Sequence, residues 1–534
     1  MNTKANSTPK GFWRENVEAL TFAVIMALVI KQFAFEAYKV PTQSMEPTII
    51  GREFGGSRLI ANKFTYMLRD PARWEVMIFH YPHNRMLNYV KRGVGVGPEW
   101  MFIRGGDLFL ADYDLDRDAA FASAKVLRKP RALQDRLFDM NNCIPPGKRE
   151  VENFRSYWVN ENGGSAGGVK PNFDENIVHI DGTKKPVRVR FTRPASEMSA
   201  IGTKDRVICN RRFDDWSARA PVVGDFSKFL GMAFPVGKEN LEDSVPVGDV
   251  RIRIEVKPSA SDGKVLFEIR DFSHQDPIIV EIAVEGANEK GSMTLGSVKK
   301  DIAGRVPADS WTEISVSNCD DRIEVRIDDE VVLEYDYEHE MFPAARALLS
   351  NSQLDPAPIT EPLKEKAPRK AFENAVLWGF SGGKADFREI EFSRDNYYTE
   401  AGATDFHIPA DNFLMLGDNS PDSLDGRGWR VSELQYKDDD GKVVTMYGDA
   451  EAVNESPVRP ISNPFDSNTR FQDVYGNMHH LDPARIVMVP KKVGDGVEEM
   501  LASKTYLGNF VPRKFIQGRA YMTFFPIFQI GPIR

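Results

Sequence analysis

The sequence predicts a mostly β protein, in which an antiparallel β core follows one apolar N-terminal helix and a jelly-roll-like β-sandwich is inserted into that core. Residues 17–35 are the most apolar stretch, and as a helix they would span about 28 Å, close to the hydrocarbon thickness of a bilayer. Short β-branched segments with alternating polar residues follow directly after this stretch and recur between residues 250 and 335.

Composition excludes several classes of protein. The 534 residues include 69 basic and 78 acidic side chains, so the net charge of −9 argues against a general nucleic-acid binder. Three cysteines, Cys143, Cys209 and Cys319, are too few for a disulfide framework or a Cys₄ zinc site. The eight histidines form no HExxH pattern. We therefore expect neither a metal nor a cofactor.

The N-terminal apolar segment is preceded by a basic flank. Lys4, Lys10 and Arg14 stand against the single acid Glu15, and the positive-inside tendency places residues 1–16 in the cytoplasm and the rest of the chain outside. A cleavable signal peptide has a similar basic start and apolar core, and a buried amphipathic helix is a further alternative. We favour an uncleaved membrane anchor over residues 17–35, because the segment that follows carries residues suited to catalysis.

Strand-like segments divide the chain into regions. Residues 36–104 read as an antiparallel sheet, and residues 105–214 as a mixed region whose basic run Lys125–Arg136 suggests a solvated helix face. Residues 215–395 read as the sandwich, with a hairpin at Asp328-Asp329. The run from Trp311 to Tyr335 is similar to concanavalin-like (laminin-G-like) jelly-roll domains.

Three separated segments carry residues suited to catalysis. Ser44 lies between Pro41 and Pro47, which restrict the backbone around it. Lys91 lies in an apolar strand, where burial lowers the pKa of a lysine and makes its neutral amine a possible general base. In the polar turn 417–429, Asp425 and Arg427 could pair, and Ser423 could accept a hydrogen bond from a lysine amine.

Together these segments resemble the type I signal peptidases, which are membrane-anchored serine–lysine proteases. Four sequence boxes of that family are matched in order behind the apolar segment: Pro41–Thr48, Tyr89–Gly95, Gly417–Arg427 and the positions Val511, Pro512, Ile516, Gly518, Arg519 and Ala520. The chain departs from the family at Gly95–Glu99, where Gly97 and Pro98 are exchanged, and at Ser420-Pro421. Neither departure removes a catalytic group.

The resemblance implies roles for individual residues. Ser44 would be the nucleophile and Lys91 the general base, with the Ser44 amide and the Thr42 hydroxyl as the oxyanion hole. Ser423 would orient the Lys91 amine, and Met45 would pack beside the nucleophile and keep the amine dry. Further support would come from the charged residues Arg92, Asp418, Asp425 and Arg427.

The resemblance also implies an organisation and a location. The catalytic core would comprise 36–104, 396–430 and 508–534, interrupted by the mixed insertion 105–214, the sandwich 215–395 and a second insertion over 431–507. A single-pass protein of the bacterial cytoplasmic (inner) membrane would cleave exported preproteins after small residues of the Ala-x-Ala type at the outer, periplasmic face. Its partners would be these preproteins, the lipid bilayer and the secretion translocon, but no nucleic acid.

Two other functions stay open on the sequence. The sandwich could serve a membrane-tethered binding protein whose peptidase-like scaffold is inactive, and a serine–lysine autoprotease of the repressor type is a third candidate. The C-terminal segment Tyr521–Ile530 reads either as a core strand or as an apolar surface that dips into the bilayer.

Overall fold

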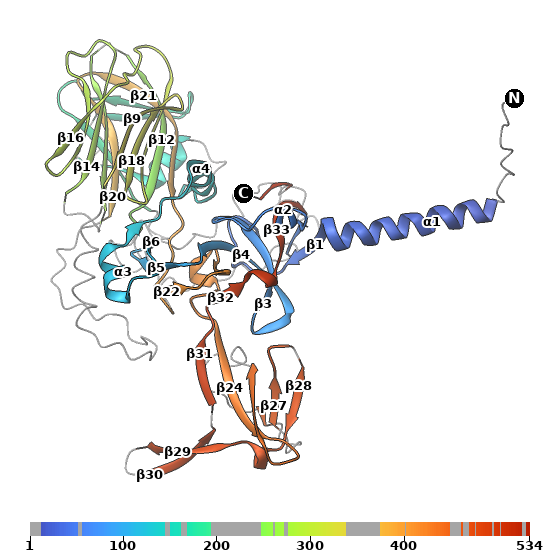
Figure 1. Ribbon diagram of the computed structural model, residues 1–534. Helices are drawn as coiled ribbons and strands as arrows, with labels where there is room; N and C mark the ends of the chain where they lie inside the picture. The colour runs from blue at the N-terminus through green and yellow to red at the C-terminus, as the bar shows by residue number, and fades with distance from the viewer. Residues whose placement is uncertain are drawn as a thin grey trace, which may run out of the picture. The chain divides into compact units, whose positions relative to one another are not determined.

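The computed structural model describes residues 12–51, 56–144, 150–161, 168–193, 247–259, 262–271, 276–337, 374–400, 402–448, 461–462, 469–475, 477–493, 496–501, 503–525 and 530–533 (Figure 1). They divide into two compact units. The first unit comprises Met1–Pro98, Ile408–Asp418 and Ser423–Arg534, and the second comprises Glu99–His407 and Asn419–Asp422. Cys209 lies outside the described residues.

One apolar helix begins the described chain. Helix α1 (Phe12–Val29) continues into a π-helical turn, η1 (Ile30–Ala34), which leads directly into strand β1 (Phe35–Val40). The window Asn16–Ala34 is long and apolar enough to cross a membrane, and none of it is buried against the described protein. The predicted apolar helix is therefore present, and it does not pack as a core helix among these residues.

The first unit is built on an eight-stranded antiparallel sheet. Its order is β1-β2-β33-β3-β4-β23-β32, with β34 pairing with β33. The bounds are β2 (Ser57–Asn62), β3 (Val76–Tyr81), β4 (Asn84–Val96), β23 (Asn412–Leu416), β32 (Phe510–Pro512), β33 (Ile516–Phe525) and β34 (Gly531–Pro532), and a short helix α2 (Thr65–Leu68) follows β2. Three distant stretches of sequence thus form one sheet. Residues 521–525 are strand, as one of the two interpretations of this segment expects, whereas 526–529 lie outside the described residues.

The same unit contains a smaller β region between β23 and β32. Strands β24 (Arg430–Lys437), β25 (Val443–Gly448) and β31 (Ser503–Leu507) form one sheet, and β26 (Ile461–Ser462), β27 (Thr469–Gln472) and β28 (Met478–Leu481) form another. Strands β29 (Met488–Val493) and β30 (Gly496–Leu501) pair as a hairpin. A small apolar core is formed by Leu434, Phe471, Leu481 and Ile486.

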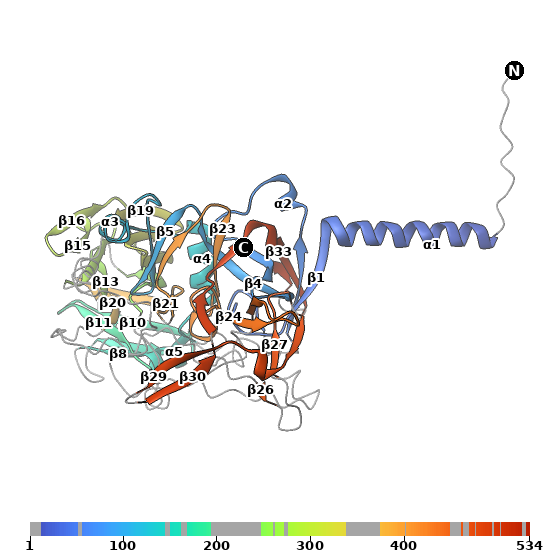
Figure 2. The ribbon, with the colours of Figure 1, turned by 60° about the horizontal axis from the view of Figure 1, so that its bottom comes forward.

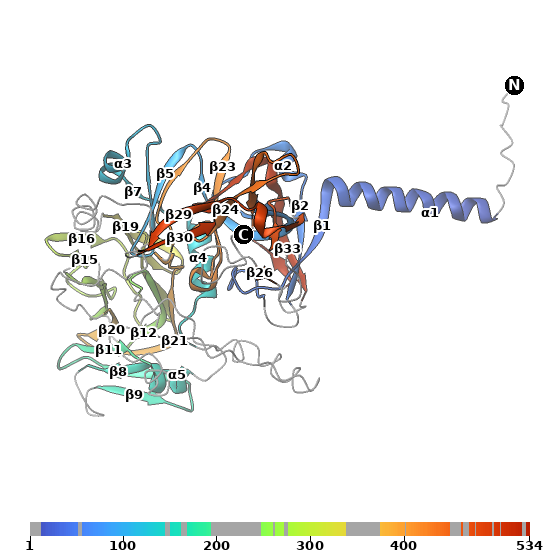
Figure 3. The ribbon, with the colours of Figure 1, turned by 90° about the horizontal axis from the view of Figure 1, so that it is seen from below.

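The second unit contains the β-sandwich. One seven-stranded sheet has the order β19-β18-β17-β12-β21-β10-β9 and the other β16-β15-β14-β13-β20-β11-β8; Figures 2 and 3 show these strands from two further directions. The first sheet comprises β9 (Val169–Asn172), β10 (Ile177–Asp181), β12 (Val250–Pro258), β17 (Thr312–Cys319), β18 (Arg322–Ile327), β19 (Glu330–Asp336) and β21 (Lys384–Arg394). The second comprises β8 (Trp158–Asn160), β11 (Val187–Phe191), β13 (Lys264–Arg270), β14 (Ile278–Ala283), β15 (Gly291–Leu295), β16 (Val298–Ile302) and β20 (Ala375–Ser381). Alternating apolar residues from both sheets form one continuous core.

The sandwich begins earlier in the chain than the sequence suggested. Strands β8–β11 lie within the range 105–214 that the sequence analysis set apart as a mixed region. Of these strands, β10 pairs with β21 and β11 with β20, about 200 residues later in the chain, while β9 pairs with β10 and β8 with β11. The strand-to-strand partners, and not the local pattern, therefore define the boundary of the sandwich.

The remaining elements of the second unit include a four-stranded sheet of order β22-β5-β6-β7. Its strands are β5 (Glu99–Arg104), β6 (Asp107–Ala111), β7 (Lys125–Val126) and β22 (Asp405–Ile408), accompanied by the helices α3 (Arg117–Ser123), α4 (Arg131–Met140) and α5 (Glu150–Tyr157). The predicted hairpin at Asp328-Asp329 is confirmed: both residues have positive φ angles, 45° and 64°, as a two-residue type I′ turn requires. Asp320-Asp321 forms a second turn of this kind, with φ angles of 49° and 58°.

Candidate active site

Ser44 lies in the tight turn that follows β1. The turn is closed by backbone hydrogen bonds from Glu46 to Gln43 (3.0 Å) and from Ile49 to Met45 (2.9 Å). The Ser44 side chain is buried, and its Oγ lies 3.4 Å from the Oγ1 of Thr42. The amide of Ser44 has no acceptor among the described residues. Met45 is fully buried in the core beneath the turn, so this side chain anchors the turn to the sheet.

Lys91 lies on β4, in the middle of the eight-stranded sheet. Its side chain is only 3% exposed, and its Nζ donates a hydrogen bond to Ser423 Oγ at 3.0 Å. Burial is the main cause that lowers the pKa of Lys91 to about 8, and Arg427 lowers it further, while Asp425 and Asp418 act in the opposite direction. The amine therefore loses its proton far more readily than an ordinary lysine.

Two buried arginine–carboxylate pairs flank the amine. Arg92 donates from Nε and Nη2 to Asp418 at 2.7 and 2.6 Å. Arg427 donates from Nε and Nη2 to Asp425 at 2.8 and 2.7 Å. Burial by itself would raise the pKa of Asp425, but the bidentate contact with Arg427 and the charge of Lys91 hold it below its usual value. Each of the two carboxylates near Lys91 thus already has an arginine as its bidentate partner.

Gly417 lies where the segments of the site meet. A Cβ built on this residue would lie 2.1 Å from Ser423 Oγ and 2.4 Å from the carbonyl oxygen of Ser44. Only glycine permits this close approach. The amide of Gly417 donates to Asp425 at 3.0 Å, which fixes the start of the polar turn.

The structure therefore gathers the candidate site residues in the first unit. Ser44 with Thr42 and Met45, Lys91 with Ser423, and the two charged pairs are all contributed by segments around Gly417. Ser44 and Lys91 are not hydrogen bonded to each other in this part of the described chain. Residues of the fourth sequence box help to form the hydrophobic core of this unit: Val511 and Ala520 are each buried in one of its two core clusters.

Sequence reasoning overlooked two groups that hold the Arg92–Asp418 pair. The Thr48 hydroxyl donates a short hydrogen bond to Asp418 Oδ2, and the carbonyl of Trp74 accepts from Arg92 Nη1 at 2.7 Å. Thr48 is the last residue of the first box, so its position was a usable signal. Trp74 has a φ of 72°, an unusual conformation that the local sequence does not predict.

Comparison with known proteins matches the N-terminal part of the chain to one family. Residues 13–151 match the family model described as signal peptidase, peptidase S26. Signal peptidase I of Aquifex aeolicus is 31% identical over 103 residues, which are 19% of this chain and 36% of that protein. The probable signal peptidase I-2 of Synechocystis sp. is 32% identical over 120 residues, which are 22% of this chain and 53% of that protein. The chain thus spans about half or less of the length of these curated relatives.

The solved structures that resemble this chain do so only weakly. The carbohydrate-binding module CBM66 from Bacillus subtilis aligns with 45% of this chain and 96% of its own length, at 9% identity and a TM-score of 0.22. A likeness at this level says nothing about a ligand. The sequence matches, by contrast, confirm the predicted resemblance: residues 13–151 match the peptidase S26 family model, and this part of the chain is similar to type I signal peptidases.

Proposed function

We propose that this protein is a membrane-anchored serine endopeptidase that removes N-terminal signal peptides from exported preproteins. The observation that carries the proposal is the Lys91 amine, which is enclosed, has a pKa near 8 and is held by Ser423 beside the glycine that Ser44 also contacts. At pH 7 roughly one Lys91 amine in ten is neutral, whereas an ordinary lysine is almost completely charged. The peptidase S26 match supports the same function.

The proposed reaction begins at the Ser44 hydroxyl. Its oxygen attacks the scissile carbonyl while the neutral Lys91 amine takes the hydroxyl proton. The resulting ammonium gives this proton to the departing amine, and the peptide bond breaks to leave an acyl-enzyme. Lys91 then removes a proton from the water that hydrolyses the ester, and Ser44 is regenerated.

The oxyanion of each tetrahedral intermediate needs hydrogen-bond donors. The Ser44 amide is a candidate because it has no acceptor among the residues that the structure describes. The Thr42 hydroxyl is the second candidate, since its oxygen lies 3.4 Å from Ser44 Oγ. Donors that are fixed before the reaction stabilise the developing charge without reorganising.

The flanking ion pairs have an electrostatic role in this proposal. An unpaired carboxylate near Lys91 would stabilise its ammonium form and raise its pKa. Because Arg92 and Arg427 neutralise Asp418 and Asp425, the effect of burial dominates and the amine stays a usable base.

We further propose that α1 anchors the protein in the cytoplasmic membrane of a bacterium. The basic residues before the apolar window favour an N-terminus inside the cell and the chain after Ala34 outside it. This topology brings the site to the periplasmic face, where exported preproteins emerge from the translocon, and small residues of the Ala-x-Ala type would precede the scissile bond. The alternative of a binding protein on an inactive scaffold is not favoured, since both Ser44 and Lys91 are present.

A direct test uses the full-length protein in detergent micelles and a preprotein with an Ala-x-Ala site. We expect cleavage at that site, verified by mass spectrometry, and a loss on the order of 10⁴-fold or more for Ser44→Ala. Ser57→Ala is the matched control, because Ser57 is also a buried serine of the first unit but lies outside the proposed machinery. Cleavage at an unchanged rate by Ser44→Ala would refute the role of Ser44, and cleavage at other sites only would refute the specificity.

A further inference from the structure

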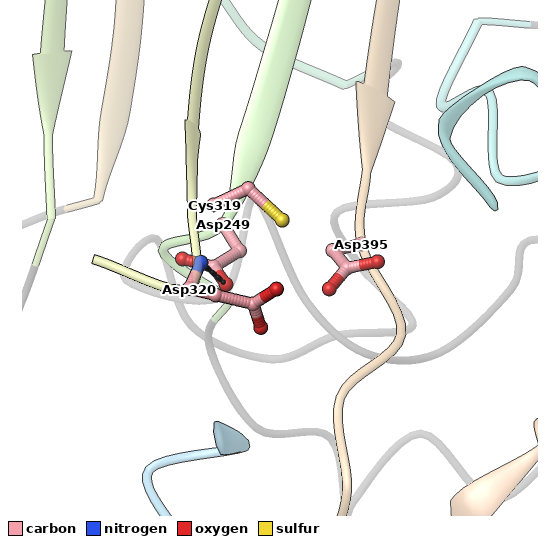
Figure 4. A group of neighbouring side chains, drawn as sticks. All are labelled: Asp249, Cys319, Asp320 and Asp395. Carbon is pink, nitrogen blue, oxygen red and sulfur yellow. Dashed lines mark hydrogen bonds between the residues drawn. The ribbon is translucent and has the colours of Figure 1, made fainter. Parts of the chain in front are cut away.

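A compact group of buried and half-buried metal-ligating side chains lies at one end of the sandwich. Asp249, Cys319, Asp320 and Asp395 each direct one ligand atom into a space in which all these atoms lie within 4.8 Å of one another (Figure 4). Asp249 directly precedes β12, Cys319 ends β17, and Asp395 directly follows β21. Three strands of the same sheet therefore converge on this group, which is independent of the proposed active site.

The group contains buried ligand atoms that lack partners. Cys319 is 2% exposed, and its thiol, which Figure 4 shows pointing toward Asp395, has no hydrogen-bond partner among the described residues. Asp395 is completely buried, and its Oδ1 likewise has no hydrogen-bond partner in this part of the chain. Leaving a carboxylate oxygen buried and unsatisfied is costly, so these atoms indicate a missing cation or donor.

The protein supplies one cation to this group. Lys129 Nζ lies 2.5 Å from Asp320 Oδ1 and 2.6 Å from Asp395 Oδ2. Asp320 is satisfied further by the amide of Lys129 and by Gln134 Nε2, at 2.9 and 3.1 Å. Asp249 accepts from the amide of Asp320 at 2.9 Å but has no ion pair among the described residues. Two of the three carboxylates thus share one ammonium, and Asp249 and Asp395 retain oxygen atoms without an ion pair beside the Cys319 sulfur.

We propose that Asp249, Cys319, Asp320 and Asp395 bind a divalent transition-metal ion of the zinc type next to the Lys129 ammonium. Mixed carboxylate and thiolate ligands suit Zn²⁺, whereas Ca²⁺ and Mg²⁺ take oxygen ligands only. Tetrahedral Zn²⁺ requires ligand atoms about 3.5 Å apart, so the group contracts on binding. The Cys319 thiol releases its proton to solvent as the thiolate forms.

The metal would act structurally, because Cys319, Asp320 and Asp395 are buried, Asp249 is half-buried, and all four belong to strand ends or to the Asp320-Asp321 turn. It would tie the ends of β12, β17 and β21 together and balance the excess of carboxylates. The sequence alone does not predict such a site, because the ligands lie up to 146 residues apart and no spacing motif links them.

The test uses cobalt as a spectroscopic stand-in for zinc. The full-length protein is treated with a chelator, dialysed and titrated with Co²⁺ and then with Zn²⁺. We expect one Co²⁺ per chain, a thiolate-to-cobalt charge-transfer band in the near ultraviolet, and loss of this band when Zn²⁺ displaces the cobalt. Cys319→Ser should abolish the band, whereas Cys143→Ser and Cys209→Ser should keep it.

A second variant guards against misfolding of the Cys319 variant. Asp249→Asn leaves the thiol intact and should weaken Zn²⁺ binding by about 10-fold or more, with an unchanged far-ultraviolet circular dichroism spectrum. The proposal is overturned if the wild-type protein takes up no stoichiometric Co²⁺ or Zn²⁺. It is equally overturned if the charge-transfer band survives Cys319→Ser, or if Ca²⁺ alone binds.

Discussion

Two lysines, one in each unit, are almost equally buried but have opposite pKa shifts. Lys91 in the first unit is 3% exposed and Lys129 in the second is 4% exposed. The pKa of Lys91 is lowered to about 8, mainly by burial. Burial also lowers the pKa of Lys129, but the charges of Asp320 and Asp395 outweigh it and raise the pKa well above its usual value. Burial alone therefore does not make a lysine a base.

The difference lies in the partners of the nearby carboxylates. Around Lys91, Asp418 and Asp425 each bind an arginine through two hydrogen bonds. Around Lys129, Asp320 and Asp395 have no arginine partner among the described side chains, and both bind the ammonium directly. A buried lysine becomes a general base where its acidic neighbours are already neutralised, and a permanent cation where they are not.

The largest expected effect is on catalysis by Lys91. Lys91→Met should lower the rate of preprotein cleavage on the order of 10⁴-fold, because the proposed reaction then lacks the amine that accepts the Ser44 proton. The fold should persist, since the amine has one hydrogen bond, to Ser423, and makes no ion pair among the described residues. Cleavage kinetics and circular dichroism measure the two effects. A fully active Lys91→Met variant would show that Lys91 is not the general base, so that the two lysines would no longer differ in function.

The converse effect is expected at Lys129. In the presence of a chelator, Lys129→Met should destabilise the sandwich by about 3–5 kcal/mol, because it leaves Asp320 and Asp395 buried without a counter-charge. Amide hydrogen exchange measures this loss of stability, and the exchange rates of β12, β17 and β21 should increase. The cleavage rate per folded molecule should stay unchanged. Unaltered exchange in these strands would show that Lys129 is not the cation that stabilises the group.

These two lysines also show what the sequence could and could not predict. Lys91 lies among apolar residues of a strand, so its burial and lowered pKa followed from the local pattern, and the sheet around it was foreseen in the same way. Lys129 lies in the basic run Lys125–Arg136, for which a solvated helix face was expected, and that expectation was wrong for this residue. Its partners Asp320 and Asp395 are 191 and 266 residues away in the sequence, and β10 and β11 likewise pair with β21 and β20, about 200 residues later. Local pattern carries no information about such contacts.

A smaller effect is expected when one of the two arginines that neutralise the carboxylates near Lys91 is replaced. Arg427→Met would leave the Asp425 carboxylate unpaired, so the pKa of Lys91 should rise. A rise of about one unit would cut the rate at pH 7 roughly 10-fold and would restore it at higher pH. The pH dependence of cleavage measures this shift. Arg427→Lys retains the charge and should shift the profile less, and an unmoved midpoint in Arg427→Met would contradict the shielding role.

The smallest effect separates positioning of the Lys91 amine from control of its charge. Ser423→Ala removes the neutral hydroxyl that accepts from Lys91 Nζ at 3.0 Å. A lost hydrogen bond of this kind corresponds to about a fivefold decrease in kcat, with KM little changed. Since no charge is removed, the midpoint of the pH profile should stay near 8, and high pH should not restore the rate. Ser423→Thr keeps the hydroxyl and serves as the control. A midpoint that moved as expected for Arg427→Met would mean that Ser423 controls the charge of the Lys91 amine rather than its orientation. The two arginine pairs would then no longer suffice to explain why the pKa values of Lys91 and Lys129 differ.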